Sequence, residues 1–237
     1  MKKYIALFSV TVITLFIFNS CKLGGGETTP PSAAFFIVHA SPNAPNVDVI
    51  VNGGFYVQNF AYGSDTGYFF VPPATYNLKI AAPTGSTAYP VDANVTFAAG
   101  KYYSVFAIDS ASKLKSAIVE DVLSVPGTDS VRLRFFQFSP NATYLTAKFK
   151  NTTTNTDSVV YSGRSFNDQN NNNNLALFTT IKAGTYNLTI IKADGSSLIN
   201  FTGLVFCNSL SYTVYLRGFE GGTGTQALDK GIVENLQ

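Results

Sequence analysis

The ten residues Phe35–Ala44, FFIVHASPNA, recur at Leu133–Ala142 as LRFFQFSPNA. In both places an apolar run leads into the same four residues, Ser-Pro-Asn-Ala. Proline fixes φ and has no amide donor, so each run must end and turn at this point. A strand-like run followed by a fixed turn, present twice, is typical of a duplicated β domain.

Further matches follow in the same order along both halves of the chain. Residues 74–80 match 184–190, residues 103–106 match 212–215, and residues 118–121 match 232–235. The offset between the copies grows from 98 to 114 residues, which indicates longer loops in the second copy, including the asparagine run 170–174. We predict a first domain over residues 34–123 and a second over residues 131–237, separated by the turn signal Pro126-Gly127.

Within each copy, apolar and polar residues alternate with the period of a β-strand. Val47, Val49 and Val51 share one face of one such strand, and Asn52-Gly53 ends it as a tight turn. Only 13% of the residues are charged, and Phe and Tyr number 20 and 13, which favours sheet and excludes a coiled coil. We therefore predict an all-β chain with two tandem immunoglobulin-like antiparallel β-sandwiches, each of about seven or eight strands.

The N-terminus has the pattern of an export signal. Lys2 and Lys3 precede an apolar run, Tyr4–Phe18, that is too short to span a bilayer. The segment resembles a bacterial lipoprotein signal, in which the cysteine after a small residue is acylated; here Ser20 precedes Cys21. We predict a signal peptide over residues 1–20 and a lipid-anchored flexible tether over residues 21–33. The alternative is an ordinary signal peptide with an incidental cysteine.

The cysteine count and the net charge agree with export. The two cysteines are Cys21 and Cys207, so acylation of Cys21 leaves no disulfide; we expect Cys207 to be a small buried residue of a strand. The formal net charge of +2 disappears when Lys2 and Lys3 leave with the signal peptide. A near-neutral mature chain lacks the basic surface that nucleic-acid binding requires, and we predict no nucleic-acid partner.

Residues 39–53, HASPNAPNVDVIVNG, closely resemble the signature of the domain-of-unknown-function 4397 family, with Asn43 in place of the usual aspartate. The resemblance covers residues 34–122 well and is degenerate over residues 131–234. It implies an immunoglobulin-like sandwich of a bacterial envelope or secreted protein, and it implies no accepted activity.

The signature residues also have a direct physical interpretation as a turn. Prolines and short polar side chains fix the chain between two strands, and the second copy keeps Ser139-Pro140-Asn141-Ala142 while losing the histidine and the aspartate. We therefore predict a structural role for the signature turn, which comprises His39, Ser41, Pro42, Asn43, Pro45, Asp48, Asn52 and Gly53.

Patterns that carry chemistry are sparse. His39 is the single histidine and no Gly-x-Ser-x-Gly elbow is present, so we predict no catalytic residues. With one histidine, one unmodified cysteine and no Asp-x-Asp-x-Asp-Gly loop, we also predict no metal site and no cofactor.

The remaining function classes are binding and structural support. We expect a lipid-anchored cell-envelope protein, most simply on the outer membrane and facing either the periplasm or the exterior, that binds a glycan or protein ligand or serves as a spacer. Tyr89, Tyr102, Tyr103, Tyr144, Tyr161 and Tyr215 are candidate stacking platforms. The alternatives are a glycan-binding module of a surface polysaccharide system and an envelope hydrolase.

Three short segments carry a candidate modification. Asp-Ser-apolar triplets at residues 109–111, 129–131 and 157–159 resemble an O-glycosylation acceptor pattern of some Gram-negative envelopes. The resemblance implies Ser110, Ser130 and Ser158 as acceptors.

Overall fold

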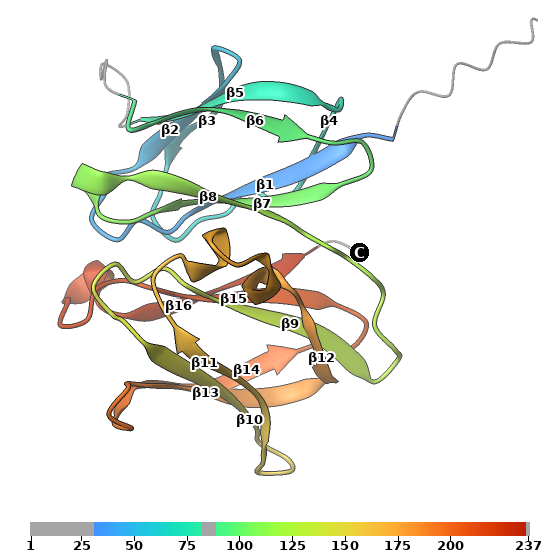
Figure 1. Ribbon diagram of the computed structural model, residues 1–237, viewed down its shortest axis with the longest axis vertical. Helices are drawn as coiled ribbons and strands as arrows, with labels where there is room; N and C mark the ends of the chain where they lie inside the picture. Colours follow the sequence, from blue (N-terminus) through green and yellow to red (C-terminus); the bar gives the residue numbers. More distant parts are fainter. Residues whose placement is uncertain (1–30, 82–88, 236–237) are drawn as a thin grey trace, which may run out of the picture.

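The structure is a computed structural model that describes residues 31–81 and 89–235. In these residues the chain forms two β-sandwiches stacked on one another (Figure 1). The all-β, tandem-sandwich prediction is confirmed. The expected signal peptide, Cys21 and most of the tether lie outside the described residues. No helix in the described part of the chain is long and apolar enough to cross a membrane.

The first sandwich packs the sheet β4-β1-β7-β8 on the sheet β3-β2-β5-β6. Its strands are β1 Ala33–His39, β2 Val47–Val51, β3 Gly54–Phe60, β4 Phe69–Val71, β5 Ala74–Ala81, β6 Val91–Phe97, β7 Tyr102–Ile108 and β8 Lys115–Glu120. The predicted alternation in β2 is correct, because Val47, Val49 and Val51 all face the core of this sandwich.

The second sandwich repeats the arrangement, with sheets β12-β9-β15-β16 and β11-β10-β13-β14. Its strands are β9 Ser130–Gln137, β10 Leu145–Asn151, β11 Asp157–Arg164, β12 Thr179–Lys182, β13 Gly184–Ile191, β14 Ser197–Phe206, β15 Ser211–Arg217 and β16 Asp229–Asn235. The loop from β11 to β12 is longer than its counterpart and carries two 3₁₀ turns, η2 Asp168–Asn170 and η3 Asn173–Ala176.

One sheet of each sandwich is mixed rather than wholly antiparallel. β1 pairs with β7 in parallel, and β9 pairs with β15 in parallel. The strands of each pair are separated by several intervening strands, which supplies the long connection that a parallel pair needs. The signature turn begins this connection, since it leads the chain from β1 in one sheet to β2 in the other.

The two mixed sheets face each other and share a third hydrophobic core, which we call the junction. β1 is buried on both faces, because Phe35 and Ile37 fill its own sandwich while Phe36 and Val38 fill the junction. The ring of Phe106 lies 4.9 Å from that of Phe138 and 5.5 Å from that of Tyr215, centroid to centroid. Apolar burial on this scale makes the two sandwiches one unit.

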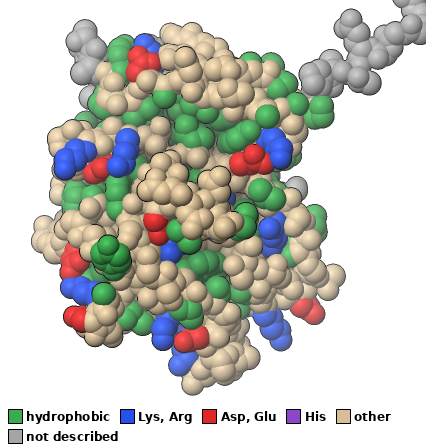
Figure 2. Space-filling model, viewed as in Figure 1, with side chains coloured by type: hydrophobic (Ala, Val, Ile, Leu, Met, Phe, Trp, Pro, Cys, Tyr) green, Lys and Arg blue, Asp and Glu red, His purple; other side chains and the backbone are tan. Residues whose placement is uncertain are grey.

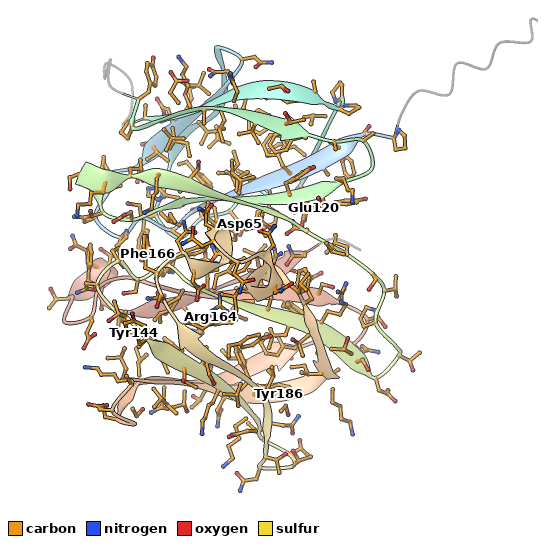
Figure 3. The ribbon with its side chains drawn as sticks, viewed as in Figure 1. Asp65, Glu120, Tyr144, Arg164, Phe166 and Tyr186 are labelled. Atoms are coloured by element: carbon orange, nitrogen blue, oxygen red, sulfur yellow. The ribbon has the colours of Figure 1, made fainter. Side chains whose placement is uncertain are left out.

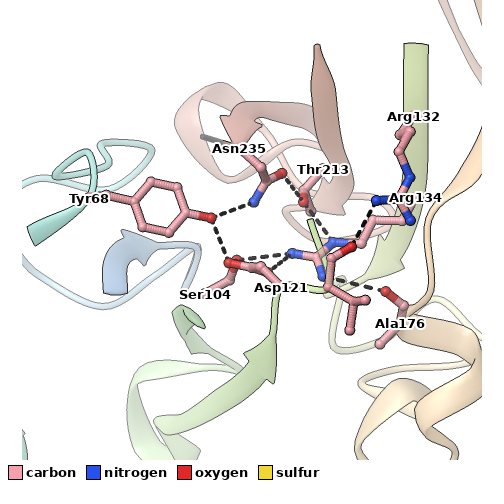
Figure 4. A network of polar contacts seen from close by, with 9 residues as sticks. Tyr68, Ser104, Asp121, Arg132, Arg134, Ala176, Thr213 and Asn235 are labelled. Atoms are coloured by element: carbon pink, nitrogen blue, oxygen red, sulfur yellow. Dashed lines mark hydrogen bonds and ion pairs between the residues drawn. The ribbon is translucent and has the colours of Figure 1, made fainter. Parts of the chain in front are cut away.

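A buried ion pair crosses the junction. The Arg134 guanidinium of β9 donates to the Asp121 carboxylate that follows β8, and both side chains are fully buried (Figure 4). The same guanidinium donates to Ser104 Oγ at 2.9 Å and to Thr213 Oγ1 at 2.8 Å. Because neither charge reaches water, each depends on the other sandwich for its compensation.

Tyr68 and Asn235 complete this network. The Tyr68 hydroxyl donates to Asp121 Oδ2 at 2.6 Å and accepts from Asn235 Nδ2 at 3.0 Å (Figure 4). Burial, followed by the neighbouring Asp121 charge, raises the pKa of the Tyr68 hydroxyl, which therefore remains a donor at neutral pH.

The network is built from equivalent positions of the two copies. Ser104 donates to Asp121 as Thr213 donates to Asn235, and the repeat aligns these two pairs. The position of Phe36 in the first copy holds Arg134 in the second. The junction is therefore a pseudo-twofold interface between the two copies. In the second copy Arg134 stands at the position of Phe36, and Asn235 stands at the position of Asp121. These two replacements leave one buried positive charge, on Arg134, and one buried negative charge, on Asp121.

Replacing the buried carboxylate tests the junction. Asp121→Asn should lower the free energy of unfolding by about 3–5 kcal/mol, because it leaves Arg134 charged and uncompensated. The matched control is its neighbour Glu120→Gln, which removes an exposed pair with Lys101 at 2.7 Å and should cost at most about 1 kcal/mol. Urea unfolding of both variants measures the difference, and equal losses would contradict a compensated buried pair.

Candidate functional site

The signature turn is held by the loop that follows β7. Ser41 Oγ donates to the Asp109 carbonyl at 2.5 Å, and Asn43 Oδ1 accepts from the Ala111 amide at 2.8 Å. In the second copy, Asn141 Oδ1 accepts from the Glu220 amide at 2.9 Å in the equivalent place. The retained asparagine thus ties the turn to its neighbouring loop in both copies, and Ser41 adds a second bond in the first copy.

The His39 side chain is fully buried and contacts two backbone groups of the turn. Its Nε2 lies 3.0 Å from the Pro45 carbonyl oxygen, and its Nδ1 lies 3.4 Å from the Ser41 amide. A carbonyl needs a donor and an amide needs an acceptor, so the ring is neutral with its proton on Nε2. Burial lowers the pKa of His39, as does the charge of Arg217, against the opposing effect of the Pro45 bond.

Gln137 reproduces this arrangement in the second copy. Its Oε1 accepts from the Ser139 amide at 2.5 Å and its Nε2 donates to the Ala142 carbonyl. Glutamine therefore accepts from the same backbone amide as His39, two residues on, and donates to a carbonyl one position earlier in the turn, since Ala142 aligns with Ala44. The apparent loss of the histidine in the second copy is a replacement by a hydrogen-bonding equivalent.

The remaining signature residues brace β2. Asp48 is buried and its Oδ1 accepts from the Asn59 amide at 2.7 Å. Asn52 and Gly53 both have positive φ, 50° and 81°, as a two-residue hairpin turn requires. Asn52 Oδ1 also accepts from the Asn77 amide of β5 at 2.8 Å.

The outer side of the turn borders a shallow hollow of about 530 Å³ to which both sandwiches contribute. Its lining residues are Pro42, Asn43, Ala44, Pro45, Asn46, Ala61, Tyr62, Thr225 and Gln226. Prolines, neutral amides and one tyrosine supply hydrogen bonds and apolar contact but no nucleophile paired with a base. Within residues 31–81 and 89–235, no three metal-ligating side chains cluster.

Residues 33–148 match the family model described as Domain of unknown function (DUF4397). This part of the chain matches the DUF4397 family. The match contains the whole signature turn and the first sandwich, and it runs into β10 of the second. No curated protein matches the chain significantly.

The three candidate acceptor serines differ in exposure. Ser158 lies exposed on β11, next to Asp157, whose carboxylate is 3.6 Å from Lys148 Nζ. Ser110, before η1 Ala111–Lys113, and Ser130, at the start of β9, are both half-buried. Ser158 is thus the most accessible of the three hydroxyls.

The candidate stacking tyrosines mostly serve the fold. Tyr215 is buried in the junction, and the Tyr161 hydroxyl donates to the Leu133 carbonyl at 2.7 Å. Tyr144 and Tyr89 expose 67% and 40% of their surface and are the two large exposed tyrosines among the described residues.

The expectation that Cys207 is buried is wrong. It is exposed in the turn after β14, because the alternation of that strand ends with the buried Phe206.

The sequence interpretation missed the buried arginines. Arg134 crosses the junction, and Arg164 donates to both Asp168 oxygens at 2.6 and 2.8 Å and to the Phe135 carbonyl at 2.5 Å. An arginine inside the apolar run LRFF was the available signal for Arg134, since a buried cation demands a partner.

The Gln137 arrangement predicts how His39 can be replaced. His39→Gln should change the free energy of unfolding by less than about 1 kcal/mol, because a glutamine here can accept from the Ser41 amide and donate to a carbonyl of the turn, as Gln137 does. His39→Ala should cost about 2–5 kcal/mol, since it leaves the buried Ser41 amide without its acceptor, the Pro45 carbonyl without its donor, and a cavity in place of the ring. Chemical denaturation compares the variants, and a glutamine variant as unstable as the alanine variant would refute the equivalence.

His39 also predicts a pH dependence of stability. Because its pKa is lowered in the folded chain, the unfolded chain takes up a proton first as the pH falls below about 6.5. The stabilising contribution of neutral His39 is complete above that pH and is lost as the pH falls through the folded-state pKa. The wild type should therefore lose stability relative to His39→Gln between about pH 6.5 and 5. Parallel stability profiles of the two proteins would speak against this.

Proposed function

We propose that this chain is a lipid-anchored, non-catalytic protein of the bacterial cell envelope with a binding or structural role. It acts as one rigid body of two sandwiches that holds its exposed loops and edges at fixed positions. The ligand of such a body is a glycan or a protein segment rather than a substrate to be transformed.

One observation carries the non-catalytic part of the proposal. The polar side chains of the signature turn are committed to backbone groups, and His39 uses both ring nitrogens in this way. A general base must reach the proton that it abstracts, and a fully buried ring with both nitrogens occupied offers none. The signature therefore supports a rigid turn.

The junction supports a rigid-body role. The shared apolar core and the Arg134–Asp121 pair join the sandwiches over the faces of two sheets. An interface that is large and hydrophobic opposes the relative motion that is the default for linked domains. Lys, Arg, Asp and Glu side chains are interspersed over the face shown in Figure 2, which suits a near-neutral envelope protein.

The N-terminal sequence supports the anchor. Cys21 follows a basic start, an apolar run and a small residue, and about ten residues lead from it to Pro31. Pro31 lies just before the start of β1, where its carbonyl accepts from the Gly100 amide at 3.3 Å. The signature turn follows the other end of β1. A tether anchored at Cys21 would therefore join the first sandwich at the start of β1, which is the end remote from the signature turn.

Removing the acylated cysteine tests the anchor. Cys21→Ala should move the protein from the membrane fraction to the soluble fraction, because each buried methylene of the acyl chains contributes about 0.8 kcal/mol of membrane affinity. Cys207→Ala is the matched control, since it removes an exposed cysteine from the second sandwich and should leave the protein with the membrane. Immunoblots of the membrane and soluble fractions give the result. If Cys21→Ala stays in the membrane fraction as the wild type does, the anchor proposal is wrong.

A further inference from the structure

β8 is an edge strand whose outer backbone groups are free. It is the last strand of the sheet β4-β1-β7-β8, and the Asp121 amide after it donates to the Tyr102 carbonyl of β7 at 2.7 Å. Antiparallel pairing alternates, so the backbone groups of Ser116, Ile118 and Glu120 point away from β7. No backbone bond from elsewhere in the described residues reaches these three positions.

A groove of about 400 Å³ runs along this edge. Ile118, Glu120 and Val122 line one side, and Asn170, Asn173 and Leu177 of the β11–β12 loop line the other. We call it the β8 groove. The consecutive residues Ile118, Val119 and Glu120 all line it, so it meets β8 at its hydrogen-bonding edge rather than on one face. Its volume lies within the range of ligand sites.

The far wall of the groove offers uncommitted amides. The Asn170 and Asn173 side chains line it and bond to no other residue in the described ranges. Gln169 is 98% buried, also lines the groove, and its Oε1 has no hydrogen-bond partner among the described atoms. Unsatisfied buried polar atoms are rare in folded proteins and mark places where a further partner is missing.

The wall is held in place from both sandwiches. Arg164 donates hydrogen bonds to Asp168 at the start of η2 and to the Phe135 carbonyl of β9. Lys115 of β8 lies 4.6 Å above the ring of Phe166, which Figure 3 labels together with Arg164. The loop 165–178 that carries the wall is longer than its counterpart 61–68. The second copy has thus added a fixed segment opposite a free strand edge.

We infer that the β8 groove binds an extended peptide segment of a partner protein, which adds to the sheet as a fifth strand. Its backbone pairs with Ile118 and Glu120 on one side and with the Asn170 and Asn173 carboxamides on the other. Val122 and Leu177, each 51% exposed, receive alternate apolar side chains of the segment. This inference deepens the proposed binding role and rests on it.

Two further features define the occupant. The groove is continuous with the junction, since Val119 belongs to the junction core and Ala176 packs against it, so a bound segment extends an interface that is already apolar. Glu120 is the charged residue of the lining and is paired with Lys101 at 2.7 Å. The segment is therefore uncharged where it lies against β8, and about five residues of it cover Ile118 to Val122.

Peptide selection on the purified full chain tests the inference. The probe is a displayed library of random peptides of about eight residues, which is longer than the stretch that covers Ile118 to Val122. Selection should enrich uncharged, β-prone peptides, and the synthetic, fluorescently labelled consensus peptide should bind in an anisotropy titration. Ile118→Pro should weaken this binding at least about tenfold, because it removes the outward amide that pairs with the peptide. It breaks no backbone bond to β7, although it also removes the packing of the Ile118 side chain against the first core.

Two variants keep the result interpretable. Ser116→Pro makes the same change on the same strand outside the groove lining and should alter affinity less than about twofold. Asn170→Ala with Asn173→Ala changes two exposed loop side chains and should weaken binding about threefold or more even if Ile118→Pro proves unstable.

Failure to enrich any peptide would overturn the inference, as would a peptide that binds the groove variants as tightly as the wild type. Glycans that bind the chain and lose affinity in these variants would also overturn it, because they would make the groove a carbohydrate site. None of these outcomes depends on the fractionation of Cys21→Ala. The peptide-binding inference and the lipid-anchor proposal can therefore fail independently of one another.

Discussion

The buried pair of Arg134 and Asp121, set in the apolar junction, is the constraint on which the rest of the structure depends. An uncompensated charge in this place would cost about 3–5 kcal/mol, which is a large fraction of the stability of a domain of this size. The pair therefore allows one relative placement of the two sandwiches. The hollow beside the signature turn and the β8 groove both draw walls from the two sandwiches and exist because of that placement.

Duplication followed by divergence explains how the pair arose in a symmetric setting. Asp121 and Asn235 are equivalent in the repeat and both bond the Tyr68 hydroxyl, so two identical copies would bring two carboxylates close together at the junction. The second copy instead holds Arg134 and Asn235 at the positions of Phe36 and Asp121, which replaces a like-charge encounter with a compensated pair. The exchange of His39 for Gln137 follows the same logic, because the hydrogen-bonding pattern is kept while the residue changes.

The strands and the duplication were predictable from sequence because both leave local or repeated patterns. Alternating valines predicted β2, and the Ser-Pro-Asn-Ala turns predicted where β1 and β9 end. The parallel pairing of β1 with β7 was not predictable in this way, since strand alternation is the same in both pairings. The apolar run at residues 35–38 did signal a strand buried on both faces, but it could not say that a second sandwich covers the outer face.

The candidate site shows a similar division. The turn residues carry their own signal, since proline and asparagine act on neighbouring backbone. The junction network does not, because Tyr68, Asp121 and Asn235 meet only after folding. The β8 groove was still less accessible, since its walls come from an edge strand of one copy and an asparagine-rich loop of the other. That loop was identified as an insertion, but its position over a free edge depends on the tertiary structure.

Scanning calorimetry of the full chain tests most directly whether the two sandwiches are one cooperative unit. A shared core predicts a single unfolding transition whose calorimetric enthalpy equals its van't Hoff enthalpy, with a value on the order of 140 kcal/mol for about 200 ordered residues. Two resolved transitions, or a van't Hoff enthalpy near half the calorimetric one, would mean that the sandwiches unfold independently, and would contradict the account.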